Sequence, residues 1–280
     1  MDLIFSDIHA DFKALNLILK VVKDSEFINQ YGKFTRVINL GDILGRGLQP
    51  KEVINTLNNL KKKYHLISLL GNHDEAFLNK KIITNNPEES IRAHSLLDEN
   101  DLQIFQKGLD GKIFPYEFID TEKNIICVHG GPLDPDKITP NDAGENSWRY
   151  NKSWQRITES EREFFSSAGY HYNPSSAFSE VKTKLDNFVI FCGHQHTETV
   201  HRENKSGIQN ILEDTKCISQ KFSRFTLNKH SFVIEQNSNY LICVGLGGPA
   251  GSRSGKITTP HFCIIQYDPK IVTLFEIIEY

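Results

Sequence analysis

The sequence predicts an α/β (α+β) protein in which two β-sheets pack face to face with helices outside them. Its first two thirds alternate short apolar runs with segments of helical period, whereas the last third consists of strand-like runs separated by turns. The apolar runs are bounded by glycine or charge, which is typical of strands buried on both faces. A chain of 280 residues can bury such a core in one unit, so we expect residues 1–280 to form a single domain.

The first half is expected to alternate strands and helices. Its apolar runs predict strands at residues 3–5, 37–40, 66–70, 125–128 and 188–192. A helix is predicted over residues 10–23, because apolar side chains recur there at helical spacing, at Phe12, Leu15, Leu19 and Val22. Proline suits the first position of a helix, so a second helix is expected to begin at Pro50.

The remaining elements are expected to be helical first and then mostly strands. Residues 87–108 indicate one or two helices with Pro87 near the start, and residues 112–119 indicate another strand. The β-rich last third predicts strands at residues 231–235, 240–245, 261–267 and 271–279. A βα half followed by a β-rich half therefore fits two sheets packed face to face with helices outside.

Five short polar motifs follow the apolar runs. They are Asp7-Ile8-His9, Gly41-Asp42, Gly71-Asn72-His73-Asp74, His129-Gly130-Gly131 and Gly193-His194-Gln195-His196. Because open α/β sheets gather their sites at the carboxyl ends of strands, we expect these side chains to converge. Their carboxylate, amide and imidazole donors suit hard or borderline divalent ions rather than a thiolate site. Their number exceeds the needs of one ion, so the sequence predicts a two-metal centre that activates water and holds a phosphoryl group.

In this order the motifs resemble those of the calcineurin-like metallophosphoesterases, which are D-x-H, G-D, G-N-H-[DE], a strand-final His and G-H-x-H. The resemblance spans roughly residues 1–200. It implies a four-layer α-β-β-α sandwich of two mixed sheets flanked by helices. It also implies two divalent metal ions, with manganese preferred and iron, zinc, nickel or cobalt as alternatives. The implied ligands are Asp7, His9 and His196 for one ion and Asn72, His129 and His194 for the other, with Asp42 bridging both.

The resemblance gives His73 a different role, beside the leaving-group oxygen as a general acid or charge stabiliser. A near-neutral pKa would suit that role. Two divalent ions carry more charge than Asp7, Asp42 and a bridging hydroxide remove, which leaves an excess of about +1 for an anionic phosphate. The pKa of a water bound to such ions falls to roughly 7, so we expect the bridging hydroxide to attack phosphorus without a separate strong base.

The stretch from Gly41 to Gly47 resembles the G-D-x-x-x-R-G of PPP-type protein phosphatases and diadenosine tetraphosphatases. In those families the arginine grips the substrate phosphate, so Arg46 is expected to bind substrate and take part in catalysis. Arg149, after Trp148, is expected to offer a second phosphate contact. These residues favour a phosphatase acting on monoesters of protein or small molecules. The alternatives are a phosphodiesterase or dinucleoside polyphosphate hydrolase and, less favoured because no ligand is missing, a scaffold without turnover.

The chain departs from the PPP pattern at two positions. Gly45 stands where those enzymes usually carry an aspartate that orients the catalytic histidine. His196 is the second histidine of G-H-x-H, which many PPP enzymes lack. The chain thus resembles both the PPP-type enzymes and the small bacterial phosphoesterases. A glycine-rich turn near the end does not complete a P-loop, so its Arg253 and Lys256 are weaker candidates for substrate contact than for a plain turn.

Two polar stretches, residues 134–175 and 202–230, fit the sandwich poorly and directly follow metal motifs. Both are candidate lids or specificity walls, although a plain surface loop is the favoured interpretation of the second. A net charge of −3 and a pI near 6.4 predict no affinity for nucleic acid. No apolar run approaches a membrane span, and the chain opens on a strand-like run rather than a secretory signal. Five irregularly spaced cysteines make no disulfide framework, so we expect a cytoplasmic protein.

Overall fold

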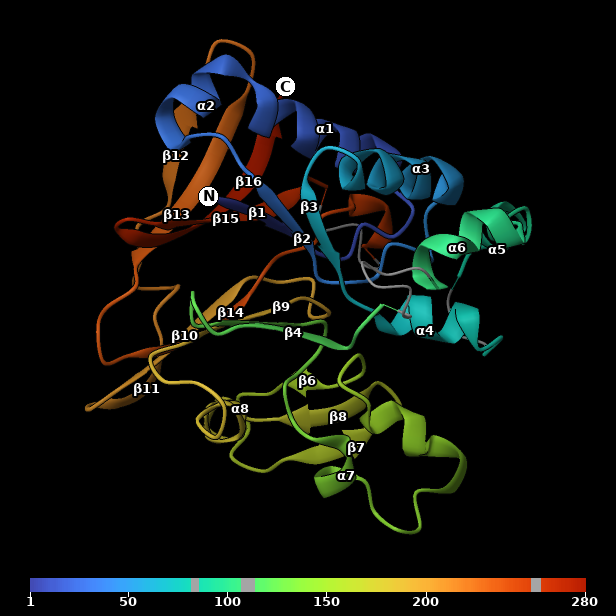
Figure 1. Cartoon of the computed structure of the whole chain (residues 1–280). Coiled ribbons are helices and arrows are strands. Elements are labelled where there is room, and N and C mark those ends of the chain that lie inside the picture. Colours follow the sequence, from blue (N-terminus) through green and yellow to red (C-terminus); the bar gives the residue numbers. More distant parts are fainter. Residues whose placement is uncertain (82–85, 107–113, 253–257) are drawn as a thin grey trace.

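Two β-sheets pack face to face in the protein, and helices cover their outer faces (Figure 1). The structure is a computed structural model that describes residues 1–81, 86–106, 114–252 and 258–280. The α-β-β-α sandwich of two mixed sheets is confirmed. A small three-stranded sheet lies beyond the second large sheet, at the bottom of Figure 1.

The seven-stranded sheet carries the amino-terminal strands. Its order is β12 (Ile218–Lys221), β13 (Thr226–Val233), β16 (Lys270–Glu279), β15 (His261–Tyr267), β1 (Asp2–Phe5), β2 (Arg36–Asn39) and β3 (His65–Ser68). Strands β1, β2 and β3 run parallel, with Asp2 beside Arg36 and Arg36 beside His65, whereas β15 pairs antiparallel with β1. The outer face is covered by α1 (Phe12–Lys23), α2 (Ser25–Tyr31) and α3 (Pro50–Lys61), which Figure 1 shows in blue.

The six-stranded sheet packs below it. Its order is β11 (Gly207–Asn210), β10 (Thr199–Asn204), β14 (Asn239–Cys243), β9 (Val189–Cys192), β5 (Ile125–Val128) and β4 (Glu117–Asp120). Strands β5, β9 and β14 are parallel, while the strands at both edges are antiparallel to their neighbours. Its outer face is covered by α8 (Pro174–Val181) and by the small sheet of β6 (Arg156–Ile157), β8 (Gly169–Tyr172) and β7 (Phe164–Ser166).

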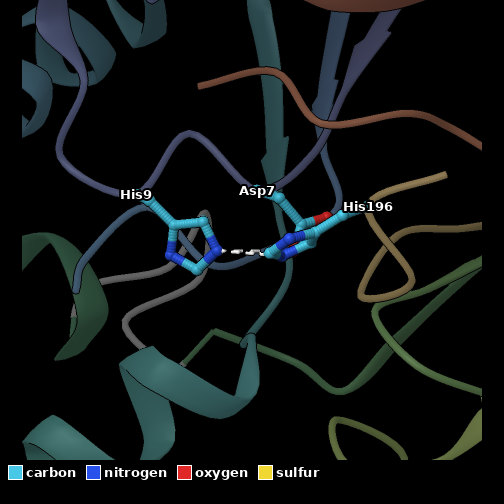
Figure 2. A group of neighbouring side chains, drawn as sticks. All are labelled: Asp7, His9 and His196. Carbon is cyan, nitrogen blue, oxygen red and sulfur yellow. Dashed lines mark hydrogen bonds and ion pairs between the residues drawn. The ribbon is translucent and has the colours of Figure 1, made fainter. Parts of the chain in front are cut away.

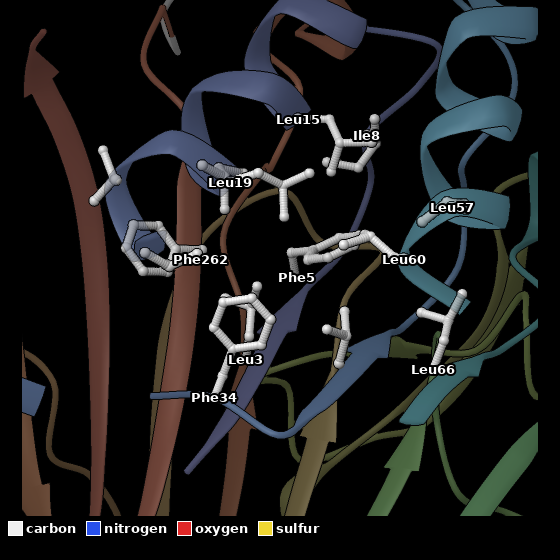
Figure 3. Packing of buried hydrophobic residues seen from close by; sticks show 14 of the residues in the cluster. Leu3, Phe5, Ile8, Leu15, Leu19, Phe34, Leu57, Leu60, Leu66 and Phe262 are labelled. Carbon is white, nitrogen blue, oxygen red and sulfur yellow. The ribbon is translucent and has the colours of Figure 1, made fainter. Parts of the chain in front are cut away.

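The central strands are apolar throughout because each has a core on both sides. In β1, Leu3 and Phe5 face the helices α1 and α3 (Figure 3). Ile4 faces the second sheet. In β9, Phe191 faces the first sheet and Ile190 faces α8. Side chains alternate between the faces of a strand, and burying each of these stabilises the fold by roughly 1.5–3 kcal/mol. This packing fixes the strand ends that carry the polar motifs.

A buried ion network joins the two sheets at the amino end of β2. Arg36 Nε donates to Asp2 Oδ2 at 2.9 Å, and Arg36 Nη1 donates to Asp120 Oδ2 of β4 at 2.6 Å. Arg36 Nη2 also donates to the Tyr267 hydroxyl at 3.1 Å, and that hydroxyl donates to Asp2. Arg36 and Asp2 are almost fully buried, so removing one partner would leave a charge uncompensated.

Most of the expected elements are present with shifted ends. The helix expected over 10–23 is α1, capped by the Asp11 side chain, and the helix expected at Pro50 is α3. The expected helical region 87–108 divides into α5 (Glu88–Ser95) and α6 (Glu99–Gln106), and the strand expected over 112–119 is represented by β4. Residues 107–113 lie outside the described residues. All five cysteines are free thiols.

The two candidate lid stretches form defined elements. Residues 134–175 contain α7 (Pro135–Ile138), the 3-10 helix η1 (Gly144–Tyr150), the small sheet and the start of α8. Residues 202–230 supply β11, β12 and parts of β10 and β13, at the outer strands of the two large sheets. The first stretch therefore lies on the second sheet, and the second runs from one sheet to the other (Figure 1).

Candidate metal centre

The seven candidate ligands lie just beyond the carboxyl ends of five strands. Their positions are Asp7 and His9 after β1, Asp42 after β2, Asn72 at the start of α4 (Asn72–Leu78) after β3, His129 after β5, and His194 and His196 after β9. The parallel strands of each sheet end at a common edge, and the two edges meet across the inter-sheet core. Residues nearly 190 positions apart are thereby brought within contact distance.

Asp7, His9 and His196 form the first group. His196 Nε2 lies 3.3 Å from Asp7 Oδ1 and 3.1 Å from His9 Nε2. Figure 2 shows the two imidazoles directed at each other with the Asp7 carboxylate beside His196. His9 Nε2 is also 3.8 Å from Asp42 Oδ2, so this carboxylate borders the group. One ligand atom from each member lies within 4.8 Å of the others, which is close enough for one ion.

Asp42, His129 and His194 form the second group, whose ligand atoms also lie within 4.8 Å of one another. His129 Nε2 is 3.5 Å from Asp42 Oδ2 and 3.3 Å from Asn72 Oδ1. The same oxygen of Asp42 thus faces His9 of the first group and His129 of the second. Asp42 therefore stands between the two groups, where a bridging carboxylate belongs.

Backbone groups orient these ligands. The His194 N–H donates to Asp7 Oδ2 at 2.9 Å, and the His73 N–H donates to Asp42 Oδ1 at 2.8 Å. His9 Nδ1 lies 3.1 Å from the Leu44 carbonyl and His129 Nδ1 lies 3.0 Å from the Leu40 carbonyl. A proton on each Nδ1 would satisfy those carbonyls and leave Nε2 free as a ligand, which is how protein metal sites commonly fix the tautomer.

The donor set fits metal ions. His194 Nε2 is buried and has no hydrogen-bond partner among the described residues, which is costly unless something binds there. Burial lowers the pKa of His194 and of His9 well below the usual value, so both imidazoles are neutral and can ligate. Burial would raise the pKa of Asp7, but the imidazoles of His196 and His129 hold it well below its usual value. Burial would lower the pKa of His129, but Asp42 raises it to about 9, so a metal ion binding there displaces a proton.

His73 and Arg46 lie beside the candidate ligands but belong to neither of the two proposed ligand sets. Arg46 Nη2 lies 3.3 Å from His73 Nε2, and Arg46 Nη1 lies 3.4 Å from His196 Nδ1 and donates to the Gly251 carbonyl. The guanidinium therefore faces the candidate centre. Arg149 is placed differently, since it donates to the Ser167 carbonyl at 3.2 Å and makes no hydrogen bond to a candidate ligand in the described part of the chain.

Comparison with known proteins identifies the family. A family model described as calcineurin-like phosphoesterase matches residues 3–198. The chain belongs to the calcineurin-like phosphoesterase family. Membership implies a hydrolase that acts on phosphoesters with the help of metal ions, and enzymes of this family typically carry two. The resemblance drawn from the five motifs is thus confirmed.

Individual relatives of this calcineurin-like phosphoesterase are distant. An uncharacterised protein of Methanocaldococcus jannaschii is 32% identical over 78 residues, and this match spans 28% of each chain. A metallophosphoesterase from Sphaerobacter thermophilus is 21% identical with a TM-score of 0.59, covering 100% of this chain and 88% of that one. A protein serine/threonine phosphatase from Saccharomyces cerevisiae is 15% identical with a TM-score of 0.52, covering 100% and 80%. At these identities the two structures show the shared fold alone.

Backbone strain gathers at five of the candidate ligands. Asp7, His9, Asp42, His194 and His196 have φ of 54°, 48°, 55°, 64° and 63°, in the left-handed region that non-glycine residues rarely adopt. Each such residue costs on the order of 1–3 kcal/mol and persists only where its surroundings enforce it. The fold therefore holds these residues in one arrangement at the expense of stability, as functional sites commonly do.

His73 differs from expectation in its pKa. Burial, reinforced by Arg46 and only partly opposed by Asp42, lowers the pKa of His73 to about 3 rather than leaving it near neutrality. His73 Nδ1 has no hydrogen-bond partner among the residues that the structure describes. Gly45 lies against this nitrogen with φ of 86°, and a side chain at that position would collide with the imidazole. The orienting carboxylate of the PPP pattern is thus replaced by close packing.

Asp74 and His94 shape the loop that carries Gly45. Asp74 accepts from the N–H groups of Leu44 at 3.0 Å and Gly71 at 3.1 Å, so it orients the backbone rather than His73. Burial and the nearby Asp42 raise the pKa of Asp74 to about 7. His94 Nε2 accepts from the Gly45 N–H at 2.9 Å. His94 lies in the region 87–108 that was expected to be helical, but the sequence carries no signal of this contact, because the partner Gly45 lies 49 positions away.

No helix in the described ranges is both long and apolar enough to cross a membrane. The expected cytoplasmic location stays a prediction. Arg253 and Lys256, the weaker candidates for substrate contact, lie outside the described residues.

Proposed function

We propose that this calcineurin-like phosphoesterase is a phosphatase that hydrolyses phosphate monoesters, either of proteins or of small molecules. The observation that carries the proposal is the position of Arg46, whose guanidinium faces both His73 and His196. A dianionic monoester presents more charged oxygens than the metal ions take up, and a guanidinium fork fits the remainder. A diester carries one charge and a second organic group, so it gains less from this arginine.

The proposed ligands divide between two ions. Asp7, His9 and His196 would hold one ion, and Asn72, His129 and His194 would hold the other, with Asp42 shared. When bound, the ions would supply a Lewis acid and a water of lowered pKa. The mixture of oxygen and nitrogen donors is compatible with manganese, which we propose as the preferred metal.

Side chains of the protein would assist the departure of the leaving oxygen. His73 Nε2 and Arg46 Nη2 are 3.3 Å apart and face the same space, so a phosphate that contacts the guanidinium also approaches the imidazole. An anionic phosphate favours the charged form of a neighbouring imidazole and raises its pKa. His73 Nε2 would then donate a proton or a hydrogen bond to the leaving oxygen as the ester bond breaks.

Product release tests the proposal, measured as the aryl alcohol for the aryl esters, as phosphate for phosphopeptides and nucleotides, and as product nucleotides for dinucleoside polyphosphates. The metal-free chain, reloaded with Mn²⁺, is assayed on an aryl phosphate monoester and on the matching diester, then on phosphopeptides, nucleotides and dinucleoside polyphosphates. We expect the monoester to have the higher kcat/KM and a chelator to abolish turnover. A higher kcat/KM for the diester or for dinucleoside polyphosphates would assign the alternative activity instead, and full turnover in chelator would refute metal dependence.

A further inference from the structure

Residues 151–172 contact each of the three elements that carry the proposed ligands of the second ion. This segment, called the brace below, contains the loop after η1 and the small sheet of β6, β7 and β8. The elements are α4, which begins at Asn72, the loop after β5 with His129, and the loop after β9 with His194. The role of these contacts rests on the two-metal site of the proposed function.

The contact with α4 runs through a buried carboxylate. Glu75, one turn after Asn72, is 3% exposed. Its oxygens accept from Asn151 Nδ2 at 2.7 Å, from the Ser153 hydroxyl at 2.5 Å and from the Tyr116 hydroxyl at 2.9 Å. Hydrogen bonds to a charged acceptor in a buried place are the strong ones, so Glu75 ties the helix that bears Asn72 to the brace.

The contact with the loop after β5 is made by backbone. The N–H groups of Gly130 and Gly131 both donate to the Lys152 carbonyl, at 3.0 and 2.9 Å. The buried Tyr172 hydroxyl donates to the Gly130 carbonyl at 2.9 Å. A side chain at Gly130 would collide with the backbone of the brace, so the approach requires glycine there. These contacts fix the residue directly after the ligand His129.

The contact with the loop after β9 involves His194 itself. Arg156 Nη1 donates to the His194 carbonyl at 3.4 Å, and the next residue, Gln195, donates through Nε2 to the Ile157 carbonyl at 2.7 Å. The Trp154 ring stands edge-on to the His194 ring, with centroids 6.5 Å apart. The brace therefore contacts this loop at the His194 carbonyl, at the Gln195 side chain and at the His194 ring.

The first ion lacks this support at two of its ligands. The backbone around Asp7 and His9 is held by other segments, since the Asp7 N–H donates to Gly41 and the His9 N–H donates to Asp42. In the described ranges, neither residue hydrogen-bonds to the brace. Support from the brace is thus concentrated on Asn72, His129 and His194.

We propose that residues 151–172 position the ligands of the second metal ion. Glu75 and Arg156 are the positioning residues, because their hydrogen bonds connect the brace to α4 and to the His194 backbone. Groups that orient metal ligands typically change affinity about 10- to 100-fold when they are removed. Loss of the brace contacts should therefore weaken one of the two metal-binding steps by this factor and leave the other within about threefold of the intact protein.

The test measures metal binding by the full chain. Metal-free Glu75→Ala and Arg156→Met are titrated with Mn²⁺ by calorimetry, and bound metal is counted after gel filtration. Arg156→Met keeps the aliphatic stem and carries the test if Glu75→Ala fails to fold. Glu75→Gln keeps an oxygen for Tyr116 and Asn151 and should restore binding. The matched control is Arg202→Met, which removes a half-buried arginine of β10 that donates to Glu235.

The expected result is one tight and one weakened step in the two test variants, with two unchanged steps in the control. The electron paramagnetic resonance spectrum of the single Mn²⁺ that remains should match that of His129→Ala rather than His9→Ala. Equal weakening of both steps, unchanged binding, or a match to His9→Ala would overturn the inference. Failure of the proposed function looks different, because the unmodified chain itself would then bind fewer than two ions or release no phosphate.

Discussion

Replacing Arg46 with alanine should reduce kcat/KM for a phosphate monoester more than for the matching diester. The guanidinium lies 3.3 Å from His73 Nε2 and 3.4 Å from His196 Nδ1, so its donors face the space where a substrate phosphate would bind. Its backbone φ of 58° is in the left-handed region, which indicates that the loop holds this residue against its intrinsic preference.

The size of the loss follows from the kind of contact. A hydrogen bond to a charged group contributes roughly 1.5–3 kcal/mol. Each 1.36 kcal/mol corresponds to about a tenfold change in rate, so the monoester should lose about 10- to 100-fold in kcat/KM. A diester should lose less, because it offers fewer charged oxygens to the arginine. Arg46→Lys should recover only part of the loss, since an ammonium cannot reproduce the planar fork.

The assay compares nitrophenyl phosphate with bis(nitrophenyl) phosphate under first-order conditions in Mn²⁺. Arg149→Ala is the matched control, because Arg149 lies on the Trp148 ring and donates to the Ser167 carbonyl. Metal content is counted in each variant, since Arg46 adjoins His196. An equal or greater loss on the diester would refute the reasoning, as would an equal loss in Arg149→Ala.

Four further predictions concern other groups. Asp42→Asn should lower both metal content and turnover, and two retained ions with normal turnover would exclude the bridging role. His73→Asn should keep both ions yet lose on the order of 10²–10⁴ in turnover, with a smaller loss for nitrophenolate than for an alkoxide leaving group. Arg36→Met should lower the free energy of unfolding by about 3–5 kcal/mol, because it leaves Asp2 buried without its cation. Burial would raise the pKa of Asp120, but Arg36 lowers it. The destabilisation by Asp120→Asn should therefore be full at neutral pH and should diminish as the pH falls from about 4 through the lowered pKa of Asp120.

The central strands and the convergence of the motifs could be predicted because burial on both faces leaves a local signal. The run Ile125–Val128 is apolar at every position, since Ile126 and Val128 face α8 and the other two face the first sheet. A polar motif directly after such a run must lie at the sheet edge, whatever the rest of the chain does. The helix α1 could also be predicted, because its buried residues recur at helical spacing.

The brace could not be predicted for the opposite reason. Strand β6 has two residues and β7 has three, and β7 exposes both phenylalanines, so neither strand shows a clean alternation. Its order comes from contacts distant in sequence, such as Ser153 with Glu75, 78 positions apart. The carboxylate of Glu75 sits in a motif that is polar anyway, so the sequence alone does not reveal that it is buried.

The departure at Gly45 bears on the choice of substrate. A carboxylate beside His73 Nδ1 would raise the pKa of the imidazole and keep it charged before substrate arrives. With glycine there, burial and Arg46 hold the pKa of His73 near 3, and the imidazole stays neutral in the free protein. Under the proposed function, protonation of His73 would depend on the negative charge that the substrate brings, and a dianionic monoester brings more than a diester. Gly45 and Arg46 would then favour the same class of ester, the first by leaving His73 Nδ1 without a carboxylate partner and the second by binding the phosphate oxygens.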